Sequence, residues 1–437
     1  MRKFLLCITL LLMLPFHASA QSADSLAGAY MNGSRWFKLY DLYEVDSAKI
    51  SPFLRDFSRV MLSQFFNQPR RAISDINRLL RQHQEEMGFG NVVSMVCLMA
   101  EDYYKLNQTD SAATTLQSFI KQVDGKVDSA AWAYPQRLYN IFSALAPYKL
   151  YETDPKASYV LPFYWDQVGD DGQYLMKMKG SFNGQPETFC FDTGASYNVI
   201  SQELAEQLQL KPIAHGLPVE GTARGEGDIV VAESIKIGNM TLRHVPFVTL
   251  DMAKGNELAG KTMSDLGVII GVKLMNRFAK YSIDMEKHTV TFFRDTQKTN
   301  ETPNLCMPSV LSVRANKGGK TLDLKLDLGK TRTELGNNYY KEFNSEVMRE
   351  GKWSVEGGAG YGGVRYHSVF KLPKLSLSID SNEFTLEDVS VIAMSDKENI
   401  FGKGYGTLGN DFLRKWQKVE IDNVNMTIHL QPKKEKK

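Results

Sequence analysis

The sequence predicts an α+β multidomain protein in which an N-terminal all-α region is followed by an all-β region built from two similar copies. Apolar residues recur with a helical period from about residue 51 to about residue 148, and the period changes to two after Pro155. Between about residues 160 and 430, single residues and short segments of the first half recur in the second half at a nearly constant offset. The chain has 437 residues, more than one hydrophobic core usually serves. We therefore expect a signal peptide at 1–20, a helical domain at 21–150 and two β-lobes at 151–300 and 301–437.

The first twenty residues have the layout of a cleavable secretory signal. Arg2 and Lys3 precede an apolar run over residues 4–16, and Ala18-Ser19-Ala20 provides small residues for cleavage before Gln21. A lipid anchor would need a cysteine at the cleavage point, whereas Cys7 lies near the start of the apolar run. No later apolar run is long enough to form a transmembrane segment. The sequence thus predicts a periplasmic or secreted protein.

The helical region shows a weak internal repeat. Phe57, Val60, Met61 and Phe65 have helical spacing. Residues 66–68 with Ala72 recur as 106–108 with Ala112, an offset of 40 that suggests stacked helical hairpins of the tetratricopeptide kind. Two interpretations stay open for this domain: a bundle that supports the rest of the chain, or a scaffold that binds a peptide or protein partner.

The β region begins with a strand pattern and continues as a duplication. Tyr174, Met176 and Met178 alternate with their neighbours, and Asn183-Gly184 supplies a hairpin turn. Landmarks then recur with an offset that drifts by three residues, which indicates two copies of one lobe. The matches are Gly184/Gly319 and Asp192/Asp327 at 135, Val219-Glu220-Gly221/Val355-Glu356-Gly357 at 136, and Ile270-Gly271/Leu408-Gly409 at 138, continuing through Lys280/Lys418, Ile283-Asp284/Ile421-Asp422 and Thr289/Thr427.

The first copy contains Asp192-Thr193-Gly194 at the end of an apolar strand, residues 189–191. Val199-Ile200 follows, and Ile269-Ile270-Gly271 comes about eighty residues later. In this context the tripeptide resembles the aspartic proteases of the retropepsin and pepsin type. The resemblance covers about residues 160–430, is specific in the first copy and degenerate in the second, and does not extend to the helical domain. It implies an all-β bilobal acid-protease fold.

Peptide hydrolysis by this chemistry needs two carboxylates that share one proton, because like charges in contact cannot both ionise. The duplication supplies one per copy, Asp192 and Asp327. By the resemblance, Thr193 would hold the two loops together through its hydroxyl, while Gly194 and Gly329 complete the loops. It also implies that apolar-apolar-Gly segments cross behind the loops, and that β-hairpin flaps near 219–229 and 355–364 cover a peptide or protein substrate.

Two residues of the second copy depart from the family pattern. Leu328 stands where the family has Thr or Ser, so one of the two cross-lobe hydroxyl bonds is missing. Lys330 replaces the small Ala195 of the first copy, and its ammonium either acts on the carboxylates or extends into solvent. The leading hypothesis is an aspartic endopeptidase that uses an Asp192/Asp327 dyad. The alternatives are a catalytically inactive peptide-binding protein of the same fold, and a homodimeric retropepsin-like enzyme that uses Asp192 from two chains.

Other patterns in the sequence point to ordinary structure. Residues 255–262 fit the phosphate-loop pattern but are followed by a strand-like run, and the glycines of 358–363 have no following helix. The histidines show no metal-ligand spacing, His244 and His367 have the context of strand or surface residues, and a serine nucleophile elbow is absent. We therefore expect no metal and no cofactor.

Charge and cysteine content exclude further classes. Without Arg2 and Lys3, the 52 basic residues fall to 50 and balance the 50 acidic ones, so no nucleic-acid surface is expected. Cys97, Cys190 and Cys306 are too few for a disulfide framework, and buried free thiols fit them better than one bridge.

Overall fold

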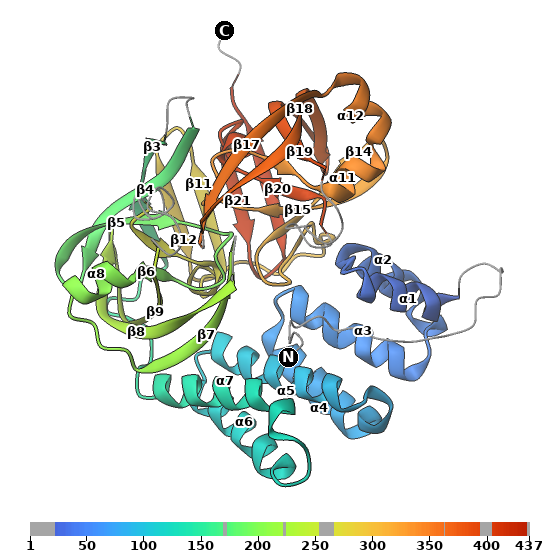
Figure 1. Ribbon diagram of the computed structural model, residues 1–437, viewed down its shortest axis with the longest axis vertical. Coiled ribbons are helices and arrows are strands. Elements are labelled where there is room, and N and C mark those ends of the chain that lie inside the picture. Colours follow the sequence, from blue (N-terminus) through green and yellow to red (C-terminus); the bar gives the residue numbers. More distant parts are fainter. Residues whose placement is uncertain are drawn as a thin grey trace. The chain divides into compact units, whose positions relative to one another are not determined.

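The computed structural model describes residues 22–168, 173–221, 224–252, 266–361, 363–393 and 404–434. The predicted signal peptide and the phosphate-loop-like residues 255–262 lie outside the described residues. The chain divides into two compact units, Met1–Pro147 and Tyr148–Lys437. Helices occupy the first unit from residue 23 to residue 145, and strands dominate the second, which confirms the predicted α+β class (Figure 1).

In the first unit, helices that follow one another in sequence pack side by side from α3 to α7. Asn67 after α3 has a φ of 52°, and Asn107 after α5 has a φ of 59°, a conformation that asparagine adopts more readily than most residues. The same turn thus recurs 40 residues apart, while the tetratricopeptide assignment stays a prediction. The helices are α1 (Ala23–Asn32), α2 (Trp36–Asp46), α3 (Pro52–Phe65), α4 (Pro69–Met87), α5 (Phe89–Lys105), α6 (Thr109–Val123) and α7 (Ala133–Leu145), with short helices η1 (Ser47–Lys49) and η2 (Ser129–Ala131).

None of the helices in the described ranges has both the length and the apolar character of a membrane span.

The first lobe of the second unit contains a sheet with the strand order β1-β9-β6-β10-β5-β4-β8-β7 among its described residues, and β3 is added to β4. Its strands are β1 (Tyr151–Glu152), β2 (Ser158–Pro162), β3 (Tyr164–Val168), β4 (Gln173–Phe182), β5 (Gln185–Phe191), β6 (Val199–Ser201), β7 (Ala214–Glu220), β8 (Arg224–Ile237), β9 (Met240–Leu250), β10 (Val268–Ile270), β11 (Lys280–Asp284) and β12 (Thr289–Phe293). Among the described residues of this lobe, the short helices α8 (Gln202–Gln207) and α10 (Val272–Met275) lie between strands.

The second lobe repeats this plan with the order β13-β14-β15-β20-β16-β19-β18-β17 in its described part. Its strands are β13 (Leu305–Cys306), β14 (Ser312–Lys317), β15 (Lys320–Leu326), β16 (Glu334–Leu335), β17 (Lys352–Gly360), β18 (Gly363–Ile379), β19 (Asn382–Ile392), β20 (Gly406–Leu408), β21 (Trp416–Asp422) and β22 (Thr427–Pro432). Its short helices are α11 (Asn337–Glu342), α12 (Asn344–Glu350) and α13 (Asn410–Leu413).

In both lobes one pair of parallel strands supports the segment that carries the aspartate. In the first lobe β5 pairs with β10, with Phe191 opposite Ile270. In the second lobe β15 pairs with β20, with Leu326 opposite Leu408. All four residues are at most 2% exposed, so these strands form the centre of each lobe's core.

The two lobes share a third sheet, ordered β2-β12-β11-β21-β22, whose central contact joins β11 to β21. Lys280 lies opposite Asp422, and Asp284 lies opposite Lys418. The repeat makes Lys280 equivalent to Lys418 and Asp284 equivalent to Asp422, so the contact is reciprocal, as in a two-fold dimer interface. The lobes of this one chain are thus related by a pseudo-two-fold axis near the Ser282–Glu420 pair.

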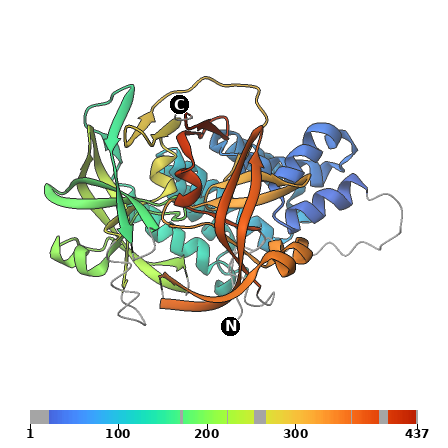
Figure 2. The same cartoon turned by 90° about the horizontal axis from the view of Figure 1, so that it is seen from above.

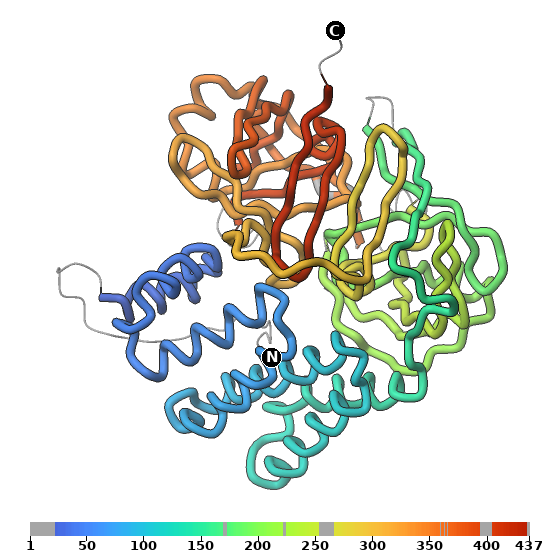
Figure 3. Tube along the Cα trace, turned by 180° about the vertical axis from the view of Figure 1, so that it is seen from behind, coloured from blue at the N-terminus to red at the C-terminus, as the bar shows by residue number. Residues whose placement is uncertain are grey.

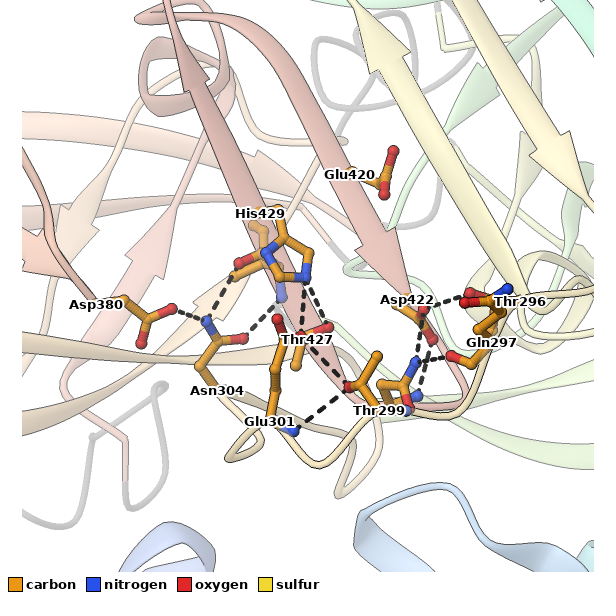
Figure 4. A network of polar contacts seen from close by, with 12 residues as sticks. Thr296, Gln297, Thr299, Glu301, Asn304, Asp380, Glu420, Asp422, Thr427 and His429 are labelled. Carbon is orange, nitrogen blue, oxygen red and sulfur yellow. Dashed lines mark hydrogen bonds and ion pairs between the residues drawn. The ribbon is translucent and has the colours of Figure 1, made fainter.

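The segment after β12, residues 294–304, crosses from the first lobe to the second (Figure 3). Side chains of the β21–β22 hairpin and of the segment itself fix this path (Figure 4). The Thr296 hydroxyl donates to Asp422, and the Thr299 backbone N–H donates to Asn425. Asn304 bonds both backbone groups of Ile428, accepting from its N–H at 2.7 Å and donating to its carbonyl at 3.2 Å. The link between the lobes is therefore an ordered part of the fold.

One predicted match between the copies is wrong. Val219 pairs with Gly225 beside the tip of the β7–β8 hairpin, whereas Val355 pairs with Ser368, well before the tip of the β17–β18 hairpin at Gly360. The two Val-Glu-Gly segments therefore occupy different positions, because the second hairpin is longer.

Candidate active site

Each aspartate directly follows the central strand of its lobe. The backbone N–H of Asp192 donates to the carbonyl of Ile270, and that of Asp327 donates to the carbonyl of Leu408, both at 3.0 Å. The apolar segments of β10 and β20 thus hold the two loops from behind in the same way. The same backbone bond at corresponding places gives the two loops matching conformations and orients their carboxyl groups alike.

The two carboxyl groups meet at the boundary between the lobes. The Gly194 N–H donates to the Asp192 carboxylate at 2.7 Å, and the Gly329 N–H donates to the Asp327 carboxylate at 2.9 Å. A β-carbon on Gly194 would lie 2.5 Å from the Asp327 carboxyl carbon, and one on Gly329 would collide with the Asp192 carboxyl group. Each carboxyl group therefore packs against the glycine of the opposite loop, where only a residue without a side chain fits.

This arrangement perturbs the ionisation of Asp192. Burial raises the pKa of its carboxyl group well above the ordinary range, and the negative charge of Asp327 and a hydrogen bond with Asp327 raise it further. The N–H groups of Gly194 and Ala195 oppose the shift by stabilising the carboxylate. The Asp192 carboxyl group therefore keeps its proton to a higher pH than an ordinary aspartate does, because its pKa is raised.

Thr193 links the two loops through its hydroxyl group. The hydroxyl donates to the Leu326 carbonyl at 2.7 Å and accepts from the Leu328 N–H at 3.1 Å, and Thr193 is fully buried. The reciprocal link is absent because Leu328, also fully buried, has no hydroxyl. One threonine thus supplies the side-chain part of this cross-lobe connection.

We expect Thr193→Val to destabilise the second unit, because it leaves the Leu326 carbonyl and the Leu328 N–H buried without partners. Each such group costs about 1–3 kcal/mol, which predicts a loss of about 2–5 kcal/mol in the free energy of unfolding. Urea unfolding of the variant and of Thr193→Ser, which keeps the hydroxyl, measures this loss. Equal midpoints for the Val and Ser variants would show that the hydroxyl bonds contribute nothing to stability.

Two supporting residues escaped the sequence analysis. The Asn198 side-chain oxygen accepts from the Gly271 N–H at 3.0 Å, and the Thr333 hydroxyl accepts from the Gly409 N–H at 3.2 Å. Both side chains are buried and anchor the segment behind the aspartate loop of their own lobe. Asn198 and Thr333 are separated by the same 135 residues as the two aspartates, a match that could have identified them.

Lys330 makes its direct contact away from the carboxyl pair. Its ammonium donates to Glu334 at 2.8 Å, and about a third of the side chain (34%) is exposed. Burial lowers the pKa of Lys330, but Glu334, and after it Asp327, raise it to a net value above the ordinary one. The lysine is therefore neither fully solvated nor directly paired with the dyad.

The described ends of the β7–β8 and β17–β18 hairpins lie close to each other (Figures 1 and 2). Tyr361 at the end of the second hairpin is 7% exposed and lies against the first. A β-carbon on Gly221 would be 3.0 Å from the Tyr361 β-carbon, and one on Gly225 would collide with the Tyr361 hydroxyl. These hairpins contain the two regions that the resemblance assigns to flaps, residues 219–229 and 355–364.

The remaining patterns lie in ordinary structural positions. Gly358 and Gly360 lie in β17, and Gly363 is the first residue of β18, so these glycines belong to a β-hairpin. Within the described residues, no three His, Cys, Asp or Glu side chains gather in a way that could hold a metal ion. His244 lies in β9 and His367 in β18. The three cysteines of the described ranges, Cys97, Cys190 and Cys306, are buried free thiols, as the sequence favoured.

Residues 178–274 match the family model described as aspartyl protease, which confirms the resemblance for the part of the chain that contains Asp192 and the β10 segment. Among solved structures, a retropepsin-like aspartic protease from Rickettsia conorii is 17% identical, with 32% of this chain and 95% of that chain covered and a TM-score of 0.21. The crystal structure of edgp is 12% identical, with 63% of this chain and 95% of that chain covered and a TM-score of 0.35. No curated protein matches the chain.

Proposed function

We propose, from the aspartyl protease pattern of the first lobe, that the chain is an exported aspartic endopeptidase that acts on a peptide or protein substrate. The pattern itself supports a protease fold. The observation that carries the activity is the contact between the Asp192 and Asp327 carboxyl groups, in which burial and the neighbouring carboxylate raise the pKa of Asp192. Neither a cofactor nor a metal ion has a role in this proposal.

The reaction follows from one proton shared by the pair. The ionised carboxylate takes a proton from a water molecule, whose oxygen attacks the scissile carbonyl carbon. The protonated carboxyl group donates its proton to the carbonyl oxygen, giving a neutral gem-diol. When the C–N bond breaks, one diol hydroxyl returns its proton to a carboxylate and the amine nitrogen takes the other proton of the pair. The products are a carboxylic acid and an amine, and the dyad regains its single proton.

Incubation of the protein with a mixed peptide library, followed by mass spectrometry of new termini, tests this proposal. We expect cleavage under acidic conditions and a decline as the pH rises through the raised pKa of Asp192, because the pair then loses its shared proton. Intact peptides at every pH would overturn the proposal.

We expect cleavage to be insensitive to chelators and to serine-directed reagents, because the proposed reaction uses a water molecule activated by two carboxyl groups. Rates measured with and without EDTA, and after treatment with a sulfonyl fluoride, check this. Loss of cleavage in EDTA followed by recovery with Zn²⁺ would contradict the metal-free mechanism.

A non-catalytic peptide-binding protein is the second candidate function. Leu328 favours it, because only one of the family's two cross-lobe hydroxyl links, that of Thr193, can form. Saturable peptide binding without new termini would support this alternative. The homodimeric arrangement has less support, because Asp192 contacts Asp327 of the same chain and needs no second copy.

Export and partner binding belong to the proposal as well. Residues 1–20 have the composition of a secretory signal, so the mature protein should begin at Gln21 in the periplasm or outside the cell. N-terminal sequencing of the protein from cell fractions tests this. The helical unit is the candidate site for a further peptide or protein partner.

A further inference from the structure

A lysine lies beside the second aspartate on the same face of its strand. In β15, Leu322, Leu324 and Leu326 are fully buried on one face. Side chains of a strand alternate between two faces, so Lys325 belongs to the other face, which Asp327 shares two residues further on. The Lys325 side chain is half-buried. This lysine therefore flanks the carboxyl pair from the second lobe.

The charges around Lys325 come from both lobes. Burial lowers the pKa of the Lys325 ammonium, and the positive charge of Lys330 lowers it further. The carboxylates of Asp327 and Glu220 raise this pKa, but the net shift is downward. Glu220 is the last residue of β7, at the tip of the first hairpin. The Lys325 ammonium thus experiences the charges of the second aspartate and of a residue of the first hairpin.

The neighbouring groups already have closer partners. Glu220 pairs with Arg224 at 2.7 Å, and Lys330 pairs with Glu334 at 2.8 Å. No carboxylate among the described residues forms an ion pair with Lys325. A half-buried ammonium of this kind has lost part of its hydration without gaining a paired charge. A carboxylate that entered this space would supply the missing partner.

The first lobe differs at the corresponding place. Cys190 precedes Asp192 by two residues, as Lys325 precedes Asp327, but it is fully buried, and burial raises the pKa of its thiol so that it stays neutral. The lysine across the strand pair from Cys190 is Lys177, which forms an ion pair with Asp166. The lysine two residues before Asp327 therefore has no ion-pair partner among the described residues, whereas the lysine opposite Cys190 in the first lobe is paired with Asp166.

We propose that Lys325 is a specificity-determining residue that selects substrates with an acidic side chain, Asp or Glu, close to the scissile bond on the side held by the second lobe. This inference rests on the proposed peptidase function and names its substrate class. A charge-assisted hydrogen bond between the ammonium and the substrate carboxylate gives the preference, which we expect to be roughly tenfold to hundredfold over a neutral isostere.

The experiment compares peptides that differ only in Glu, Gln or Lys at each of the positions flanking one cleaved bond, with free and with amidated C-termini. The enzymes are the wild-type chain, Lys325→Met, Lys325→Glu and the control Lys374→Met, which removes an exposed lysine of β18. Rates give kcat/KM for each pair. The amidated peptides distinguish a side-chain carboxylate from a chain-terminal one.

We expect wild type and Lys374→Met to prefer Glu over Gln at one position, whatever the C-terminus. Lys325→Met should lose the preference and cleave the Glu and Gln peptides with equal kcat/KM, and Lys325→Glu should prefer Lys. A preference for Glu that survives in Lys325→Met would overturn the proposal, as would equal cleavage of Glu and Gln peptides by wild type. A preference that disappears on amidation would assign the carboxylate to the peptide terminus and also overturn it.

Peptide binding separates this inference from the proposed function. Calorimetry on Asp192→Asn, with and without Lys325→Met, measures the affinity for the Glu and Gln peptides without turnover. If wild type cleaves no peptide, the peptidase proposal fails, but tighter binding of the Glu peptide that depends on Lys325 still supports acidic recognition. Equal binding of the two peptides refutes acidic recognition even if cleavage occurs.

Discussion

Asp192→Asn and Asp327→Asn are each expected to lower kcat/KM for peptide cleavage by at least about 10²- to 10⁴-fold, the usual range for removal of a general acid or base. Either change removes half of the proton-sharing pair, because an amide can neither accept the proton of the attacking water nor release one to the scissile carbonyl oxygen. Rates with a peptide found in the library experiment measure the loss. Full activity of Asp327→Asn would exclude the dyad formed within one chain.

The same variants should remain folded, and the sign of the pKa shift predicts their stability. The folded pKa of Asp192 is raised, so its proton stabilises the folded state fully below the unfolded pKa of about 3.9, and this contribution is lost as pH rises through the raised folded pKa. Asp327→Asn removes the negative charge that opposes ionisation of Asp192, so less of this stability is lost as the pH rises. We therefore expect its Tm near neutral pH to equal or exceed the wild-type value, by up to about 4 °C. A lower Tm would mean that the charge pair stabilises the fold.

Gly194→Ala and Gly329→Ala are expected to abolish cleavage as completely as loss of an aspartate. The added methyl group would stand 2.5 Å from the Asp327 carboxyl carbon in the first variant and would collide with the Asp192 carboxyl group in the second. Because the atoms nearest to each added methyl group belong to the opposite carboxyl group, that carboxyl group must move away from its position. Displacement of reacting groups by about 1 Å can cost roughly 10²-fold in rate.

Gly90→Ala in α5 is the matched control, since nothing lies within 4 Å of the position of its added carbon. Circular dichroism confirms that the variants fold, and the pH profile shows whether the remaining activity still depends on a shared proton. Wild-type kcat/KM in Gly194→Ala would mean that the carboxyl groups do not meet across these glycines during catalysis.

The proximity of the two aspartates could be predicted from the sequence because it depends on repeated local features. An apolar strand, an aspartate, a glycine and a later apolar segment recur in order, and duplication places the two loops around one axis. Thr193 was predictable for the same reason, as was the missing hydroxyl at Leu328. These features lie in buried strands and in the short loops directly after them, where residue type and position are closely coupled.

Other features depend on contacts that the sequence does not encode locally. The second hairpin is longer than the first, and this length is not evident from the sequence, so the matching Val219 and Val355 segments lie at different distances from the hairpin ends. The partner of Lys330 is Glu334 on a short strand after the loop, and no periodic spacing identifies such a pair. Asn198 and Thr333 differ in chemistry although both bond a glycine N–H, so only their separation of 135 residues marks them as equivalent.

The sheet shared by the lobes has a consequence for folding kinetics. The β11–β21 contact joins residues about 140 positions apart, so its formation must close a very long loop and should be slow. Until β21 arrives, β11 presents an unpaired edge to which another chain could add. A newly made molecule is therefore most prone to aggregation after its first lobe has formed and before its last strands are in place.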